Sequence, residues 1–137
     1  VQMSRMSARK HEKATRLLNV IVRRSRWIRG DRNSALRRST DGRMCCLGFA
    51  CRAAGYTAAA ITDKDTPGAL TDTRHAIRIR TALNRLVDKT TGTTDSLACR
   101  RLMTCNDKIH LDMTDTIRED HLRHLGRGAG LAFRFVD

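Results

Sequence analysis

The spacing of apolar residues changes along the first third of the chain and predicts a long helix, a link and a buried segment. A helix over residues 8–28, capped by Ser7, is predicted because apolar residues recur at helical spacing: Ala14, Leu17, Leu18, Ile21 and Ile28. Residues 31–38 lack this pattern and predict an irregular link before a turn at Asp41-Gly42. The uncharged run 44–51 predicts a short strand entry at 43–45 and a helix over 46–54.

The middle of the chain predicts one long loop and two helices. Residues 56–71 contain the only proline and are expected to form the loop. Asp72 is expected to cap a helix over 72–88, and Ser96 to cap a helix over 96–105.

The last thirty residues predict strand, helix, turn and strand. Alternating apolar positions predict a short strand over 109–113. The helix that follows is expected to end near Leu125 and to begin at Thr116, because Glu119 would complete a capping box. Three glycines predict a turn (Gly126, Gly128 and Gly130), and the apolar run 131–136 predicts a C-terminal strand.

Together these elements predict an α+β fold, a mainly helical single domain with two or three short strands including the C-terminal one. The length of 137 residues is typical of one domain that buries its own core. Residues 1–6 are expected to be flexible, 7–43 to form a basic helix and link, and 44–137 to form the core. The longest uncharged stretches are too short to span a membrane, so no membrane partner is predicted.

Charge is distributed unevenly, and this changes the functional picture. The chain carries a net charge of +13, and 13 of its 27 basic residues but only 3 of its 14 acidic residues lie within residues 1–43. Such a concentration is typical of a surface that meets a polyanion. On the predicted helix and link, the candidate nucleic-acid-binding residues are Arg9, Lys13, Arg16, Arg23, Arg24, Arg29, Arg32, Arg37 and Arg38.

The partner predicted from this charge is nucleic acid or a nucleoprotein complex. An acidic protein is the alternative partner, and a merely solvated polar face is the interpretation without a function. The sequence contains no zinc-finger spacing, ribonucleoprotein motif or P-loop, so base-specific recognition is not predicted. Trp27 lies among arginines, as a base-stacking residue would, but a core position is the favoured interpretation.

The cysteines raise the question of chemistry. Cys46 opens a predicted helix and is the candidate nucleophile of an alternative thiol hydrolase, with His110 as base and Asn106 or Asp112 behind it. Cysteines in apolar runs are more often buried packing residues, so no enzyme is predicted. The cysteine spacing does not match a standard zinc site, and neither a metal nor another cofactor is predicted.

A more specific motif lies in residues 41–51, which read Asp-Gly-Arg-Met-Cys-Cys-Leu-Gly-Phe-Ala-Cys. This run resembles small phage- and prophage-encoded proteins of unknown function, whose hallmark is an aromatic residue or Met followed by Cys-Cys-Leu-Gly. Weaker similarities to that group lie at Trp27, at residues 35–37, at 102–103, at 106–107 and in the apolar C-terminal strand. The resemblance implies a viral accessory or structural protein and no particular chemistry.

Charge and resemblance together suggest a non-catalytic phage accessory protein that acts in the host cytoplasm. It would bind nucleic acid or a nucleoprotein complex through the basic N-terminal helix, for host takeover or for inhibition of a host defence. The alternatives are a virion structural or assembly protein and the hydrolase that uses Cys46. An odd number of five cysteines favours reduced thiols, which agrees with the cytoplasm.

Overall fold

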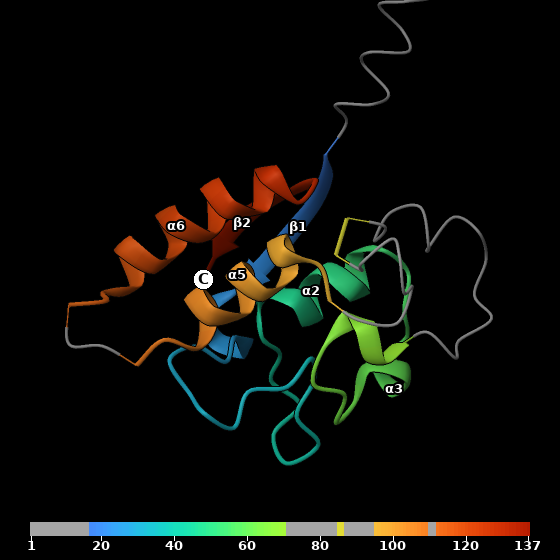
Figure 1. The fold of residues 1–137 in the computed structure, drawn as a ribbon. Helices are drawn as coiled ribbons and strands as arrows, with labels where there is room; N and C mark the ends of the chain where they lie inside the picture. Colours follow the sequence, from blue (N-terminus) through green and yellow to red (C-terminus); the bar gives the residue numbers. More distant parts are fainter. Residues whose placement is uncertain (1–16, 71–84, 87–94, 110–111) are drawn as a thin grey trace, which may run out of the picture.

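A computed structural model describes residues 17–70, 85–86, 95–109 and 112–137 and confirms the predicted α+β class (Figure 1). Within these residues the chain forms two parallel strands, four α-helices and two short 3-10 helices. In order they are β1 (Leu18–Arg23), η1 (Arg24–Arg26), α2 (Cys46–Ala53), α3 (Ala58–Ile61), η2 (Pro67–Leu70), α5 (Leu97–Asp107), α6 (Asp115–Gly128) and β2 (Leu131–Val136).

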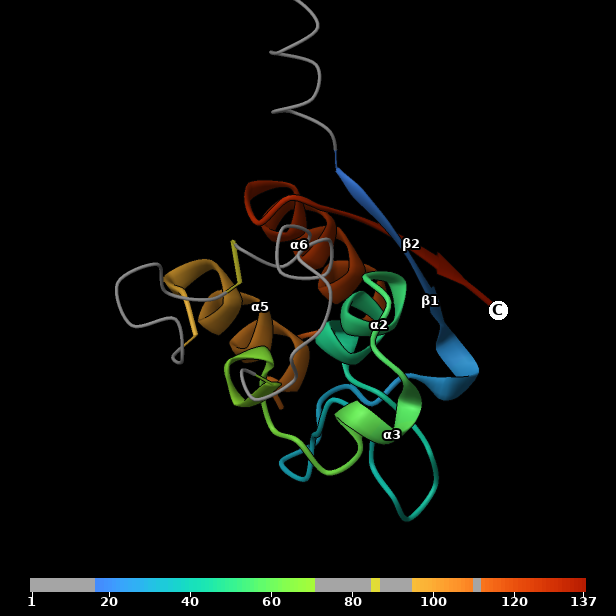
Figure 2. The same ribbon diagram turned by 90° about the vertical axis from the view of Figure 1, so that its right-hand side faces the viewer.

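The two strands come from opposite ends of the described chain and pair in parallel. Leu18 lies opposite Leu131, and the register continues to Arg23 opposite Val136. Every second side chain is buried, Val20 and Val22 on β1 and three apolar residues on β2 (Leu131, Phe133 and Phe135). The sheet therefore has one apolar face, which α2 and α6 cover, and one outer face (Figure 2).

The predicted helix over residues 8–28 is wrong for residues 18–28, which form β1, η1 and an extended segment. Residues 1–16, with the cap Ser7, lie outside the described residues. Three consecutive β-branched residues, Val20 to Val22, favour an extended backbone, and a strand buries both valines where a helix would leave them beside its apolar face. The apolar pattern of this segment fits both a helix and a strand, and pairing with β2 makes it a strand. The residues of β2 lie more than 100 positions away in the sequence.

The core lies between the sheet and the helices. Trp27 is 2% exposed and its ring lies 4.9 Å from that of Phe135, which confirms its predicted core position. The short helix α2 passes through the middle of the core, and its residues Cys46 to Cys51 are all buried. This explains the uncharged run: a helix surrounded by protein has no solvent-facing side for charge.

Gly48 allows α2 to approach the link. A Cβ atom at this position would lie 1.8 Å from the carbonyl oxygen of Leu36 and 2.9 Å from the Cβ of Met44. The approach is held by a hydrogen bond from the backbone N–H of Cys45 to the carbonyl of Ala35. The glycine of the Cys-Cys-Leu-Gly run is therefore required for helix packing.

The side chain of Asn106 joins three separate segments in the core. Its oxygen accepts hydrogen bonds from Trp27 Nε1 at 2.8 Å and from the backbone N–H of Cys46 at 3.1 Å. Its nitrogen donates to the carbonyl of Ile28 and to Asp107. The amide is fully buried and uses both its donors and both its acceptor positions, so it links Trp27, the start of α2 and the end of α5.

A second buried polar residue, Arg118 of α6, closes the end of α5. Its guanidinium donates to the carbonyls of Cys105, Asn106 and Lys108 at 2.6–2.9 Å. Carbonyls at a helix C-terminus carry partial negative charge, so this contact satisfies them and stabilises the buried cation.

Other predicted elements compare with the structure as follows. The helices predicted at 46–54 and 96–105, the latter with the Ser96 cap, and the C-terminal strand are confirmed. The loop predicted over 56–71 contains α3 and η2, and the predicted strand entry at 43–45 is a single bridge between Met44 and Trp27. The helix predicted over 72–88 falls outside the described residues, apart from 85 and 86.

Two predictions about α6 are wrong. Thr114 caps the helix by accepting a hydrogen bond from the backbone N–H of Ile117, and Thr116 is not the cap. The predicted capping box is absent, and the carboxylate of Glu119 binds Arg24. The helix also continues to Gly128, past the predicted end near Leu125. The strand predicted over 109–113, before this helix, is wrong for the described residues 109, 112 and 113, which form no strand.

Replacing Gly48 by alanine should lower the free energy of unfolding by at least about 3 kcal/mol, because the added methyl group overlaps the Leu36 carbonyl. Gly128→Ala is the matched control, since nothing lies within 4 Å of a Cβ atom there. Urea titration followed by circular dichroism measures both variants. Equal stability of the two variants would contradict the close approach.

Asn106→Ala should lower the free energy of unfolding by about 3 kcal/mol, because Trp27 Nε1 and the Cys46 N–H each lose a buried acceptor. Asn19→Ala on the exposed side of β1 is the control and should change stability by less than about 1 kcal/mol. Denaturant titration with tryptophan fluorescence is the measurement. A loss at Asn106 no larger than the loss at Asn19 would refute the linking role of this amide.

Candidate nucleic-acid interface

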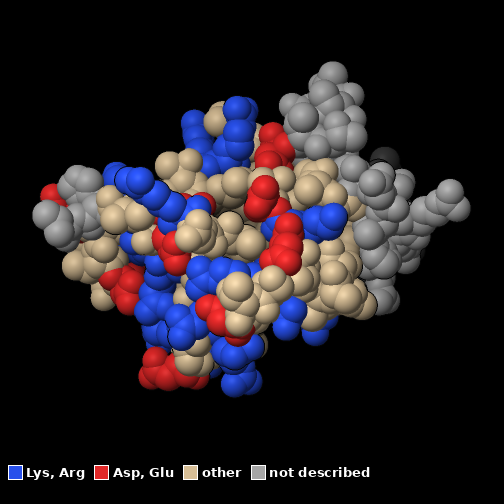
Figure 3. All heavy atoms as spheres, turned by 90° about the horizontal axis from the view of Figure 1, so that it is seen from below, with Lys and Arg blue, Asp and Glu red and all other residues tan. Residues whose placement is uncertain are grey.

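Of the nine sequence-predicted basic residues, the six that the structure describes do not form one surface. Arg9, Lys13 and Arg16 lie outside the described residues, so their placement stays a prediction. The six that are described divide into residues bound by the protein's own carboxylates and residues that are not. Figure 3 shows one face of the molecule, on which acidic side chains lie among the basic ones.

Arg24 is used inside the fold. Its Nε and Nη2 donate to the two oxygens of Glu119 at 2.9 and 2.8 Å, and its Nη1 donates to Asp137 at 2.9 Å. The hydrogen bonds to Glu119, and then those to Asp137, raise the pKa of Arg24 above its ordinary value. Glu119 is buried, so this pair attaches α6 to the end of β1 and leaves little charge for a ligand.

Arg29 and Arg38 are neutralised in the same way. Arg29 donates to both oxygens of Asp115 at 3.0 and 2.9 Å and lies over the ring of Trp27 at 4.7 Å. Arg38 donates to Asp41 at 2.7 Å and to Asp31 at 3.0 Å. Hydrogen bonding from Arg38, with a smaller contribution from the backbone N–H of Arg43, lowers the pKa of Asp41 to about 2. These arginines hold the link and the start of α6 in place.

Arg32 lies apart from the other basic residues of the link. It lines a cavity of about 290 Å³ at the start of α2, together with Asp65 and Asp107. Carboxylates on the same wall make this cavity unsuitable for a polyanion.

Two sequence-predicted residues, Arg23 and Arg37, do meet in one place. They line a hollow of about 370 Å³ with two arginines that were not predicted from the sequence, Arg26 and Arg52. We call these four residues and the wall around them the arginine hollow; its other lining residues are Ile21, Gly42, Met44, Phe49 and Ala58. Among these residues there is no Asp or Glu.

The hollow is assembled by three backbone contacts. Met44 forms a bridge with Trp27, and its N–H donates to the carbonyl of Arg26, the last residue of η1, at 3.0 Å. The turn 38–43 is closed by hydrogen bonds between the backbones of Arg38 and Arg43 and between Gly42 and Arg38. A β-bridge between Arg37 and Thr62 holds the segment of Arg37 against the end of α3, whose residue Ala58 lines the hollow. Residues far apart in sequence thus bring their guanidinium groups to one side of the molecule.

Two of the guanidinium groups approach the same point. A Cβ atom built on Gly42 would lie 3.0 Å from Nη2 of Arg26 and 3.2 Å from Nη2 of Arg37. Arg37 also donates to the hydroxyl of Thr62 at 2.9 Å, and Arg52 donates to the carbonyl of Tyr56 at 2.7 Å. These partners are neutral, so they orient the cations without cancelling their charge.

Asp63 is a carboxylate that senses the charge of this cluster, through Arg37. Hydrogen bonds from the Ser39 backbone N–H and hydroxyl lower the pKa of Asp63, and the charge of Arg37 adds a smaller effect. Asp63 is therefore already bound by Ser39, and no ion pair joins it to Arg37 among the described residues. The hollow keeps a concentrated positive charge.

The alternative catalytic residue, Cys46, lies in the wall of the cavity that Arg32 also lines. Its side chain is fully buried, and burial raises its pKa well above the ordinary value. Asn106, the proposed orienting group, receives the Cys46 backbone N–H and does not contact a histidine among the described residues. His110 lies outside the described residues. The geometry that is described disfavours a reactive thiolate at this position.

The other cysteines are also buried, and all five are free thiols. Burial raises the pKa of Cys45 to about 11. Within the described residues, no group of three or more His, Cys, Asp or Glu side chains is arranged to hold a metal ion. No helix in the same part of the chain is long and apolar enough to cross a membrane.

Comparison of the chain with protein-family models, with curated proteins and with solved structures found no match.

The thiols should react with Ellman's reagent at neutral pH only as fast as the protein unfolds, because each sulfur is buried and protonated. All five should react at once in guanidinium chloride, which is the control. Because the pKa of Cys45 is raised in the folded state, stability should also fall as pH rises from about 9 toward 11. Rapid modification of Cys46 in the folded protein would instead restore the thiol hydrolase as a candidate.

Proposed function

We propose that this protein is a non-catalytic binding protein that engages nucleic acid, alone or in a nucleoprotein complex, through the arginine hollow. The observation that carries the proposal is the convergence of Arg26 and Arg37 on Gly42, with Arg23 and Arg52 on the same wall and no carboxylate among the lining residues. Like charges held this close repel one another, and a bound phosphate would remove the repulsion.

Arginine is suited to this role because its planar guanidinium can donate two parallel hydrogen bonds to one phosphate. Three of the four arginines are exposed, and Arg37 is half-buried with its orientation held by Thr62. Arg134 extends the positive surface, since it is exposed on β2 opposite Ile21, which lines the hollow. The proposed interface is therefore smaller than the one predicted from sequence. It lacks Arg24, Arg29, Arg32 and Arg38, and it gains Arg26 and Arg52.

Binding is expected to be insensitive to base sequence. All five aromatic side chains of the protein are buried: Trp27, Phe49, Tyr56, Phe133 and Phe135. None of them is available to stack on a base, so the contacts would be made with phosphates. The viral context, in which such binding would serve host takeover or inhibition of a host defence, is supported by the sequence resemblance alone.

The double variant Arg26→Gln with Arg37→Gln should weaken binding to both duplex DNA and RNA and reduce the slope of log affinity against log salt by about 2. The matched control is Arg100→Gln with Arg101→Gln, which removes the same charge from exposed positions on α5, outside the hollow. Fluorescence anisotropy with labelled oligonucleotides at several salt concentrations measures both.

The proposal predicts a changed slope for the hollow variant and an unchanged slope for the control variant. Equal effects of the two pairs would mean that only net charge matters, and the hollow would not be the interface. Thermal unfolding of each variant shows whether the fold is retained. If the hollow variant is unfolded, Arg23→Gln with Arg52→Gln makes the same test, because Arg23 has no polar partner and Arg52 has only the Tyr56 carbonyl among the described residues.

A further inference from the structure

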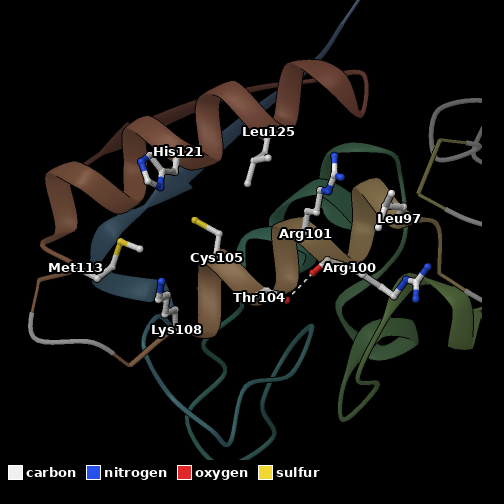
Figure 4. A pocket seen from close by; sticks show the side chains of 9 residues that line it. All are labelled: Leu97, Arg100, Arg101, Thr104, Cys105, Lys108, Met113, His121 and Leu125. Carbon is white, nitrogen blue, oxygen red and sulfur yellow. Dashed lines mark hydrogen bonds between the residues drawn. The ribbon is translucent and has the colours of Figure 1, made fainter.

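A second surface, between α5 and α6, has a different chemistry. One side is formed by Leu97, Arg101, Cys105 and Lys108, which recur every three to four residues along α5 and its C-cap and so lie in one row. The other side is formed by Leu125 and His121 of α6, with Met113 before that helix. Figure 4 shows Cys105 and Leu125 directed into the space between the two helices, with Met113, His121 and Lys108 near one end of it and Leu97 at the other end of α5. We call this space, about 380 Å³, the α5–α6 groove.

The floor of the groove is apolar. Leu97, in the first turn of α5, is 55% exposed. Met113 and Leu125 are half-buried. Cys105 is buried between the two helices, where its thiol approaches the carbonyl of Arg118. An exposed leucine alone is unremarkable, but here it continues a row of partly covered apolar side chains.

The rim of the groove is positively charged. Arg100, Arg101 and Lys108 are exposed, and the groove lining contains no Asp or Glu. Within the described residues their side chains have no carboxylate partner, unlike those of Arg24, Arg29 and Arg38. The three acidic residues of α6 are already bound elsewhere, Asp115 to Arg29, Glu119 to Arg24 and Asp120 to Arg123.

We propose that the α5–α6 groove binds an amphipathic helix of a partner protein, with apolar side chains on one face and acidic residues beside them. A third helix can pack its side chains into the space between two helices that carry a row of apolar residues. Leucines at positions i, i+4 and i+7 of the partner helix would lie along the row formed by Leu97, Arg101, Cys105 and Lys108 on α5. The positive charges of the rim, which have no carboxylate partner among the described residues, favour a partner helix with acidic residues.

Two other occupants fit the groove less well. A nucleic acid would place phosphates over the apolar floor formed by Leu97, Met113 and Leu125, which offers them no hydrogen bonds. The chain's own residues 1–16 contain five basic residues and one acidic residue, so the rim would repel them. This inference is independent of the arginine hollow.

The test uses the full chain and a synthetic helical peptide with leucines at i, i+4 and i+7 and glutamates on the flanking positions. Amide chemical shifts of the ¹⁵N-labelled protein should change at Leu97, Arg101 and Leu125 and stay constant at Arg23 and Arg37. A peptide with lysines in place of the glutamates should not bind. Arg101→Glu with Lys108→Glu should weaken binding of the acidic peptide at least about tenfold and should gain binding of the lysine peptide.

Arg26→Gln with Arg37→Gln is the control and should bind the acidic peptide as the unaltered protein does. Both changed residues of the groove variant are exposed, and thermal unfolding checks that it is folded. Absence of acidic-peptide binding, equal binding of the two peptides, or shifts confined to other surfaces would each overturn the inference. So would an oligonucleotide that shifts the groove residues directly. A failure of the arginine hollow to bind nucleic acid would not affect the inference about the α5–α6 groove.

Discussion

One buried amide holds the described elements together. Asn106 accepts from Trp27 and from the start of α2, and it donates to Ile28 and Asp107, so every hydrogen-bonding position of its side chain is used. Losing any of these hydrogen bonds would leave a buried polar group without a partner and would cost free energy of folding. One arrangement of the three segments is therefore much more stable than alternative arrangements. Arg118 adds a second constraint by binding the carbonyls at the end of α5. The core is thus specified by polar contacts as well as by apolar burial.

The arginines serve two purposes, and carboxylate partners separate them. Arg24 and Arg29 bind acidic residues of α6 and fasten the segment after β1 to that helix. Arg38 binds Asp31 and Asp41 and so holds the link together locally. Arg23, Arg26, Arg37 and Arg52 face a hollow without such partners. A high net charge destabilises a compact fold through repulsion, and internal pairing reduces this cost near the core while leaving charge at the surface. The division also explains why a count of basic residues overstates the number of arginines that lack a carboxylate partner.

Much of the fold could be predicted from local signals. The serine at position 96 caps α5 as its sequence context indicates, the uncharged run around Cys46 forms the buried helix α2, and the apolar C-terminal run is a strand. Trp27 is a core residue, as its hydrophobicity favours. These elements depend on neighbours a few residues away. The candidate interface was predicted less well: Arg23 and Arg37 were selected, whereas Arg26 and Arg52 carry no local pattern that distinguishes them from other arginines.

What the sequence determined by itself was the α+β class, the concentration of charge in the first third, and the helices whose caps and apolar rows are local. Only the tertiary structure decided that residues 18–23 are a strand, because both periods fit their apolar residues and the pairing partner is β2. Only the tertiary structure decided that Arg24 and Arg29 are paired with carboxylates, because Glu119, Asp115 and Asp137 reach them from the far end of the chain. Side-chain pairing over such separations depends on folded distances, and residue spacing carries no record of them.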